Sequence, residues 1–106
     1  MNKSAKELIN FINNSPTAFH AVKEIKNDLK NSGFKELDPA KKWNLKKGEK
    51  YFLTRNDSAL IAFITGREFL DQGLRIISSH TDSPALKIKP DPIIQNNGQY
   101  ILNTEI

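Results

Sequence analysis

Two short runs of strand-forming residues, at 51–54 and 59–64, constrain the fold of this chain more than any other feature. Tyr-Phe-Leu-Thr and Ala-Leu-Ile-Ala-Phe-Ile are rich in aromatic and branched side chains, and only Arg-Asn-Asp-Ser at 55–58 separates them. A polar segment of this length containing Asn and Asp is typical of a tight turn between antiparallel strands. The second run is apolar on both faces, so we expect a β-hairpin whose second strand lies in the interior of a sheet.

The N-terminal part of the chain has the periodicity of two amphipathic helices. Ser4 followed by Glu7 forms a capping box ahead of an apolar stripe, which predicts the first helix. Ser15 is a good N-cap and Pro16 suits a first turn, so they predict the start of the second helix. His20 lies opposite the apolar stripe of that helix, and we expect it at the surface without a direct role in a site. The expected buried stripe consists of Ala18, Val22, Ile25 and Leu29.

An imidazole and a carboxylate follow an apolar run at 74–77, which Gly73 precedes. The run predicts a short buried strand that leads into a loop. In extended chain alternate side chains share a face, so His80 and Asp82 should project to the same side. Neutral imidazole is a common zinc ligand, and a nearby carboxylate can fix the tautomer of the ring. The spacing alone leaves two interpretations open, a metal site and a capped turn in a surface loop.

The sequence around this pair resembles a known enzyme family. The run at 79–90, Ser-His-Thr-Asp-Ser-Pro-Ala-Leu-Lys-Ile-Lys-Pro, closely resembles the first metal-ligand segment of the M18 metallo-aminopeptidases, the aspartyl aminopeptidase family. Residues 15–22 and 50–63 are similar to the early helix signature and the strand pair of that family, in the same order. The resemblance implies a two-metal zinc site in which His80 is a metal ligand. It also implies that Asp82 is the catalytic carboxylate that orients a ligand or tunes the metal.

The same resemblance implies a substrate class and an assembly. The substrates are peptides with a free N-terminus, often an acidic one, and the whole protein is a homo-oligomer. M18 enzymes are several times longer than these 106 residues, so we expect an N-terminal fragment. The other metal ligands and the general base would then lie beyond Ile106, and the fragment alone would be inactive.

The expected fold is α/β, with two N-terminal helices packed on a mixed β-sheet as part of a zinc-peptidase catalytic domain. The resemblance also implies that an oligomerisation domain is inserted near residue 90, so we expect residues 1–90 to belong to the catalytic domain and residues 91–106 to begin the insertion. Pro-Asp-Pro at 90–92 marks the boundary, because proline should break the regular structure there. Beyond it, the Asn-Asn-Gly turn at 96–98 predicts another hairpin.

Composition bears on nucleic-acid binding, membrane association and location in the cell. Sixteen Lys and Arg against twelve Asp and Glu give a net charge of +4, but the lysines are scattered. The densest group, at 41–47, holds one aromatic residue, which indicates a solvated basic face and no nucleic-acid site. With no cysteine and no apolar run of about 20 residues, we expect a cytoplasmic protein without a membrane partner.

Motifs for other chemistries are missing from the sequence. The five glycines are spread singly, so no Gly-rich phosphate loop and no nucleotide cofactor site is predicted. A serine nucleophile elbow and a cysteine nucleophile are also absent. The alternative to a peptidase is a noncatalytic basic binding or docking module, in which His80 and Asp82 are structural residues.

Overall fold

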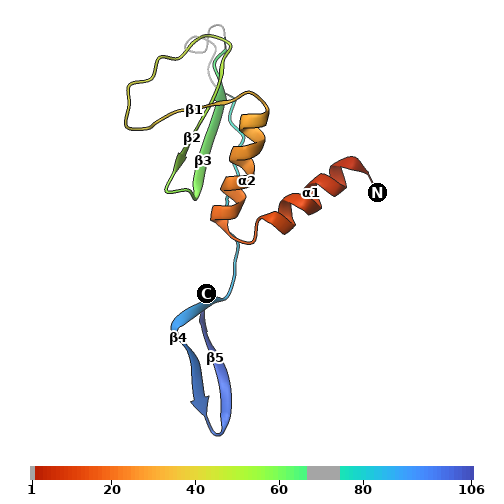
Figure 1. Ribbon diagram of the computed structural model, residues 1–106, viewed down its shortest axis with the longest axis vertical. Coiled ribbons are helices and arrows are strands. Elements are labelled where there is room, and N and C mark those ends of the chain that lie inside the picture. The colour runs from red at the N-terminus through yellow and green to blue at the C-terminus, as the bar shows by residue number, and fades with distance from the viewer. Residues whose placement is uncertain (1, 67–74) are drawn as a thin grey trace.

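The computed structural model describes residues 2–66 and 75–106. They form two helices and two small sheets, whose arrangement Figure 1 shows. Strands β1, β2 and β3 form one sheet in that order, and β4 pairs with β5 in the other. The elements are α1 (Lys3–Asn14), α2 (Ala18–Asn31), β1 (Lys35–Glu36), β2 (Lys50–Arg55), β3 (Ala59–Ile64), β4 (Lys87–Asn96) and β5 (Gln99–Glu105).

The first sheet is mixed. Its strands β2 and β3 form the predicted hairpin. β1 runs parallel to β2, and β2 pairs antiparallel with β3 from Lys50–Ile64 to Arg55–Ala59. Asn56 and Asp57 have φ angles of 50° and 51° in the connecting turn, a left-handed conformation that Asn and Asp tolerate better than most residues. Helix α2 lies along this sheet (Figure 1). The α/β class with two helices and a mixed sheet is therefore confirmed.

The core of this unit is small. Phe52 is fully buried, and Val22 of α2 and Tyr51 of β2 are nearly so. The rest of the apolar stripe expected on α2 is half-buried, whereas His20 is exposed as expected. Within the described residues, neither helix is long and apolar enough to cross a membrane.

Among the described residues β3 is an edge strand, so they do not confirm the prediction of an interior strand at 59–64. β3 has β2 as its only neighbour there, and the side chains of Ile61 and Ile64 are 63% and 60% exposed. The strand expected at 74–77 is also not found, since residues 75–77 have no regular structure and Ile76 and Ile77 are exposed. Leu74, the first residue of the predicted strand, and Gly73 before it lie outside the described residues. A strand becomes interior only when a partner pairs with its free edge, and none of residues 75–86 does so.

Both predicted helix caps are displaced in the structure. Asn2 caps α1, because its side-chain oxygen accepts a hydrogen bond from the Ser4 amide at 3.3 Å. Thr17 caps α2 by accepting from the His20 amide at 3.4 Å. Asn and Thr are both good caps, and each lies where the backbone enters the helix. Ser15 is instead the C-cap of α1.

The second sheet is a hairpin that contains the predicted Asn-Asn-Gly turn. Asn97 and Gly98 have φ angles of 48° and 78° there. The expectation that Pro-Asp-Pro at 90–92 ends regular structure is wrong, because β4 continues through it. The pairing register shifts between Ile88 and Ile93, so the prolines occupy an irregularity where no ladder donor is needed.

This hairpin projects away from the first sheet (Figure 1). The radius of gyration is 19.8 Å, whereas a compact domain of this length has about 13 Å. The hairpin therefore contributes little to the core around Phe52.

A carboxylate on β1 joins the sheet to α2. Glu36 contacts Lys26 at 2.5 Å and Lys30 at 2.9 Å, and all three side chains are partly exposed. Hydrogen bonds from these two ammonium groups hold the pKa of Glu36 below its usual value, against a smaller opposing effect of burial.

We expect Glu36→Gln to lower the free energy of unfolding of the protein by about 0.5–1 kcal/mol at neutral pH, since it removes two partly screened ion pairs. Because the folded-state pKa of Glu36 is lowered, this stabilisation is complete above the unfolded-state value, near 4.5. It is lost as the pH falls through the folded-state pKa. Urea unfolding at several pH values measures the difference. Glu7→Gln, which breaks one exposed contact of 3.8 Å with Lys3, is the control and should cost almost nothing. A difference for Glu36→Gln that persists in acid would contradict the prediction.

Candidate metal site

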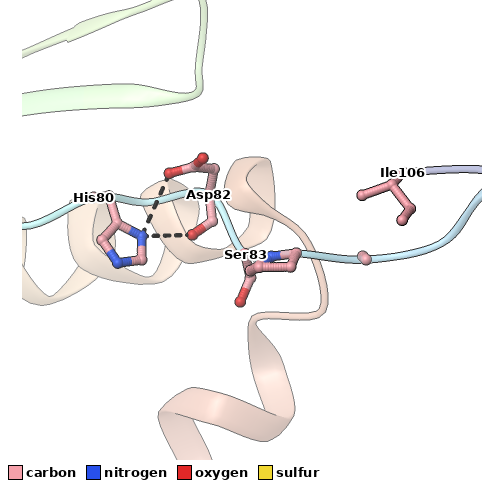
Figure 2. Close-up of a pocket in the computed structure, with 6 residues that line it drawn as sticks. His80, Asp82, Ser83 and Ile106 are labelled. Carbon is pink, nitrogen blue, oxygen red and sulfur yellow. Dashed lines mark hydrogen bonds and ion pairs between the residues drawn. The ribbon is translucent and has the colours of Figure 1, made fainter.

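His80 and Asp82 lie in an extended segment without regular structure, between the two sheets. Their side chains are 79% and 89% exposed, and the Nδ1 atom of His80 lies 3.4 Å from Oδ1 of Asp82. The structure therefore brings the two predicted residues into contact (Figure 2).

A hydrogen bond to the backbone determines the tautomer of His80. Its Nδ1 atom lies 2.7 Å from the carbonyl oxygen of Asp82, and Figure 2 shows both contacts of this nitrogen. Because a carbonyl oxygen only accepts, Nδ1 must carry the hydrogen. In the neutral ring, Nε2 then keeps its free lone pair, which is the form that binds a metal.

The donor set fits a zinc ion. Histidine ligands of metals usually donate their other ring N–H to a backbone carbonyl or a carboxylate, and His80 has both within reach. The carboxylate of Asp82 is exposed and adds oxygen donors of a kind that zinc accepts.

These two residues do not make a complete site. Catalytic zinc sites use three protein ligands, and residues 2–66 and 75–106 contain no group of three His, Cys, Asp or Glu side chains placed for a metal. His20 lies on α2, where its Nδ1 atom is 2.8 Å from the hydroxyl of Thr17. It is not among the residues that line the hollow beside His80.

That hollow is wide and open, with a volume of about 560 Å³. It is lined by His80, by residues that follow His80, and by Ile106 just after β5. The lining residues are His80, Asp82, Ser83, Pro84, Ala85 and Ile106. A surface of this shape leaves the side chains of His80 and Asp82 accessible to a ligand.

Thr81 has a role that the sequence analysis missed. Its side chain is half-buried, and its hydroxyl donates to the carbonyl oxygen of Ser58 at 2.7 Å. Ser58 lies between β2 and β3. The alternation of side chains in extended chain places Thr81 opposite His80 and Asp82, and this signal was available from the sequence.

The chain has close relatives among known proteins. It is 52% identical over 106 residues to a protein of Clostridium novyi named probable M18 family aminopeptidase 2, covering 98% of this chain and 24% of that protein. A protein of Stutzerimonas stutzeri with the same name is 42% identical over 100 residues, which are 93% of this chain and 23% of that protein. The chain thus spans about a quarter of the length of the curated relatives that it matches.

Solved structures agree with these relatives in fold. A chain in the cryo-EM structure of the Ape4 and Nbr1 complex superposes with a TM-score of 0.84 at 36% identity, over 95% of this chain and 20% of that one. Aminopeptidase I from Borrelia burgdorferi superposes with a TM-score of 0.72 at 28% identity, over 99% of this chain and 28% of that one. The family model described as aminopeptidase I zinc metalloprotease (M18) matches residues 11–106. This match covers most of the chain and includes the end of α1, all of α2 and every strand from β1 to β5. The chain therefore belongs to the M18 family of zinc metalloproteases.

Proposed function

We propose that the protein containing this chain is a zinc-dependent aminopeptidase that removes N-terminal residues, often acidic ones, from peptides. The observation that carries the proposal is the hydrogen bond from His80 Nδ1 to the Asp82 carbonyl, which leaves Nε2 free to bind a metal. Membership of a zinc metalloprotease family supports it, and so do the names of the relatives.

In this proposal the two exposed residues have separate roles. His80 binds zinc through Nε2, and the carboxylate of Asp82 orients the metal site by its charge. We propose a two-metal site whose other ligands and general base lie outside residues 1–106. Metal ions in such a site lower the pKa of a water molecule and polarise the scissile carbonyl. The open hollow beside His80 gives the end of a peptide access to this position.

We also propose that residues 1–90 are part of the catalytic domain and that residues 91–106 begin an inserted oligomerisation domain. The projecting hairpin supports this division (Figure 1). Its apolar side chains are 43% to 77% exposed, at Ile93, Ile94, Tyr100, Ile101 and Leu102. An exposed apolar surface of this kind favours contact with another protein surface. The rest of the same protein or a second copy would supply that surface. We further propose a cytoplasmic homo-oligomer that acts on peptides and binds neither nucleic acid nor membrane.

The test is hydrolysis by the full-length protein of a peptide with a free N-terminal Asp or Glu, compared with the same peptide acetylated at its N-terminus. We expect cleavage of the free peptide only. Removal of metal with a chelator should reduce the rate to background, because the pKa of an unbound water lies far above that of a water bound to a metal ion. Added zinc should restore the rate. Undiminished hydrolysis after verified metal removal, or equal cleavage of the acetylated peptide, would refute the proposal.

A further inference from the structure

The segment that carries His80 and Asp82 is extended and largely exposed. It has no strand partner among the described residues. A zinc site needs its ligands held within about 0.5 Å of their productive positions. Something other than sheet pairing must therefore fix the orientation of this segment in the part of the chain that the structure describes.

Among the described residues, a side-chain hydrogen bond joins the segment of His80 and Asp82 to the first sheet. The hydroxyl of Thr81 donates to the carbonyl oxygen of Ser58 at 2.7 Å, in a half-buried position. The other side-chain hydrogen bonds of residues 79–82 within the described part of the chain are local, from Ser79 to the carbonyl oxygen of His80 and from His80 to that of Asp82. Thr81 is thus the link between the pair and the rest of the fold within the described residues.

The acceptor of this bond is itself well fixed. The amide of Ser58 donates to the carbonyl oxygen of Arg55 at 3.2 Å. Between them, Asn56 and Asp57 have left-handed backbone angles, which leave a hairpin turn few alternatives. The carbonyl of Ser58 therefore belongs to a defined turn that the register of β2 and β3 holds in place.

The position of Thr81 between the two site residues gives the bond its effect. Because alternate side chains of extended chain point to opposite sides, attaching Thr81 to the hairpin turns His80 and Asp82 outward together. Both are almost fully exposed, whereas Thr81 is half-buried.

We propose that Thr81 is a positioning residue of the zinc site, acting through its hydrogen bond to the Ser58 carbonyl. This inference rests on the function proposed above. It assigns no contact with substrate or metal to Thr81. Its effect is to set the rotation of residues 80–82 against the turn between β2 and β3.

The experiment compares Thr81→Val with Thr81→Ser in the full-length protein. Valine keeps the branched shape and removes the donor, whereas serine keeps the donor. We expect Thr81→Val to weaken zinc binding at least about 10-fold, the size of effect that substitution of residues behind metal ligands commonly has. We also expect it to lower kcat with little change in KM. The zinc affinity and kcat of Thr81→Ser should remain within about threefold of the wild-type values, since serine keeps the hydroxyl that makes the bond. Competition with a chromophoric chelator measures the zinc affinity independently of activity.

Three further variants separate the possible outcomes. Ser79→Ala removes an exposed hydroxyl that makes a weak 3.4 Å contact with the neighbouring residue, and it should match wild type. If Thr81→Val does not fold, Thr81→Ala removes the same donor and leaves room for water to solvate the Ser58 carbonyl. Wild-type zinc affinity in the folded variant without the hydroxyl, or equal losses in the Val and Ser variants, would overturn the proposal. A His80→Ala variant that keeps its zinc would instead overturn the site assignment on which the proposal rests.

Discussion

His80→Ala in the full-length protein is expected to lose zinc and to lose aminopeptidase activity down to the background of the assay. The substitution removes the nitrogen that the structure leaves free for a metal, and it also removes the hydrogen bond from Nδ1 to the Asp82 carbonyl. A catalytic zinc site with three protein ligands loses one of them. Without the metal, water is not activated at neutral pH. Metal analysis and the turnover of a peptide with an acidic N-terminus measure the two losses.

His20→Ala is the matched control, because the chain has two histidines. His20 lies on α2 and contacts the hydroxyl of Thr17 at 2.8 Å, so its loss should affect the start of the helix only. The variant should keep its zinc and its turnover. A His80→Ala protein with full activity, or a His20→Ala protein that loses zinc, would show that the metal site lies elsewhere.

Local chemistry made part of this fold predictable. The hairpin of β2 and β3 follows from two β-type runs and a turn whose Asn56 and Asp57 accept positive φ angles. The second hairpin follows in the same way from Asn97 and Gly98. In both hairpins the residues that decide the geometry are neighbours in the sequence.

The position of a strand within a sheet was not predictable in this way. The composition of β3 indicated an interior strand, but the structure leaves one of its edges unpaired within the described residues. Interior status depends on which distant segment supplies a partner, and no local pattern contains that information. The same reasoning applies to Ile76 and Ile77, whose apolar character predicted burial although both are exposed.

The residue types of the candidate site were predictable, but the hydrogen bonds that hold them in place were not. The alternation of side chains in extended chain predicted that His80 and Asp82 lie close together, and the two side chains are in contact. The sequence did not show that the backbone of Asp82, rather than its carboxylate, makes the shorter contact with His80, at 2.7 Å against 3.4 Å. The bond from Thr81 to Ser58 spans 23 positions, and such a contact depends on tertiary structure.

This geometry leads to a sharp expectation for Asp82→Asn. The backbone carbonyl that holds the tautomer of His80 is unchanged by the substitution, and the amide preserves the size of the side chain. Only the negative charge beside the ring and the proposed metal site is lost. We therefore expect kcat to fall about 10- to 100-fold, with a smaller change in zinc content. Steady-state kinetics and metal analysis on the same preparation measure the two effects.

Asp91→Asn is the control for this charge, since Asp91 is an exposed aspartate on β4 that does not line the hollow. It should leave kcat and zinc content unchanged. If Asp82→Asn also leaves both unchanged, Asp82 contributes through its backbone alone, and its carboxylate has no catalytic role. If zinc is lost as completely as in His80→Ala, the carboxylate binds the metal directly, because an orienting charge that acts through the histidine would leave the nitrogen ligand in place.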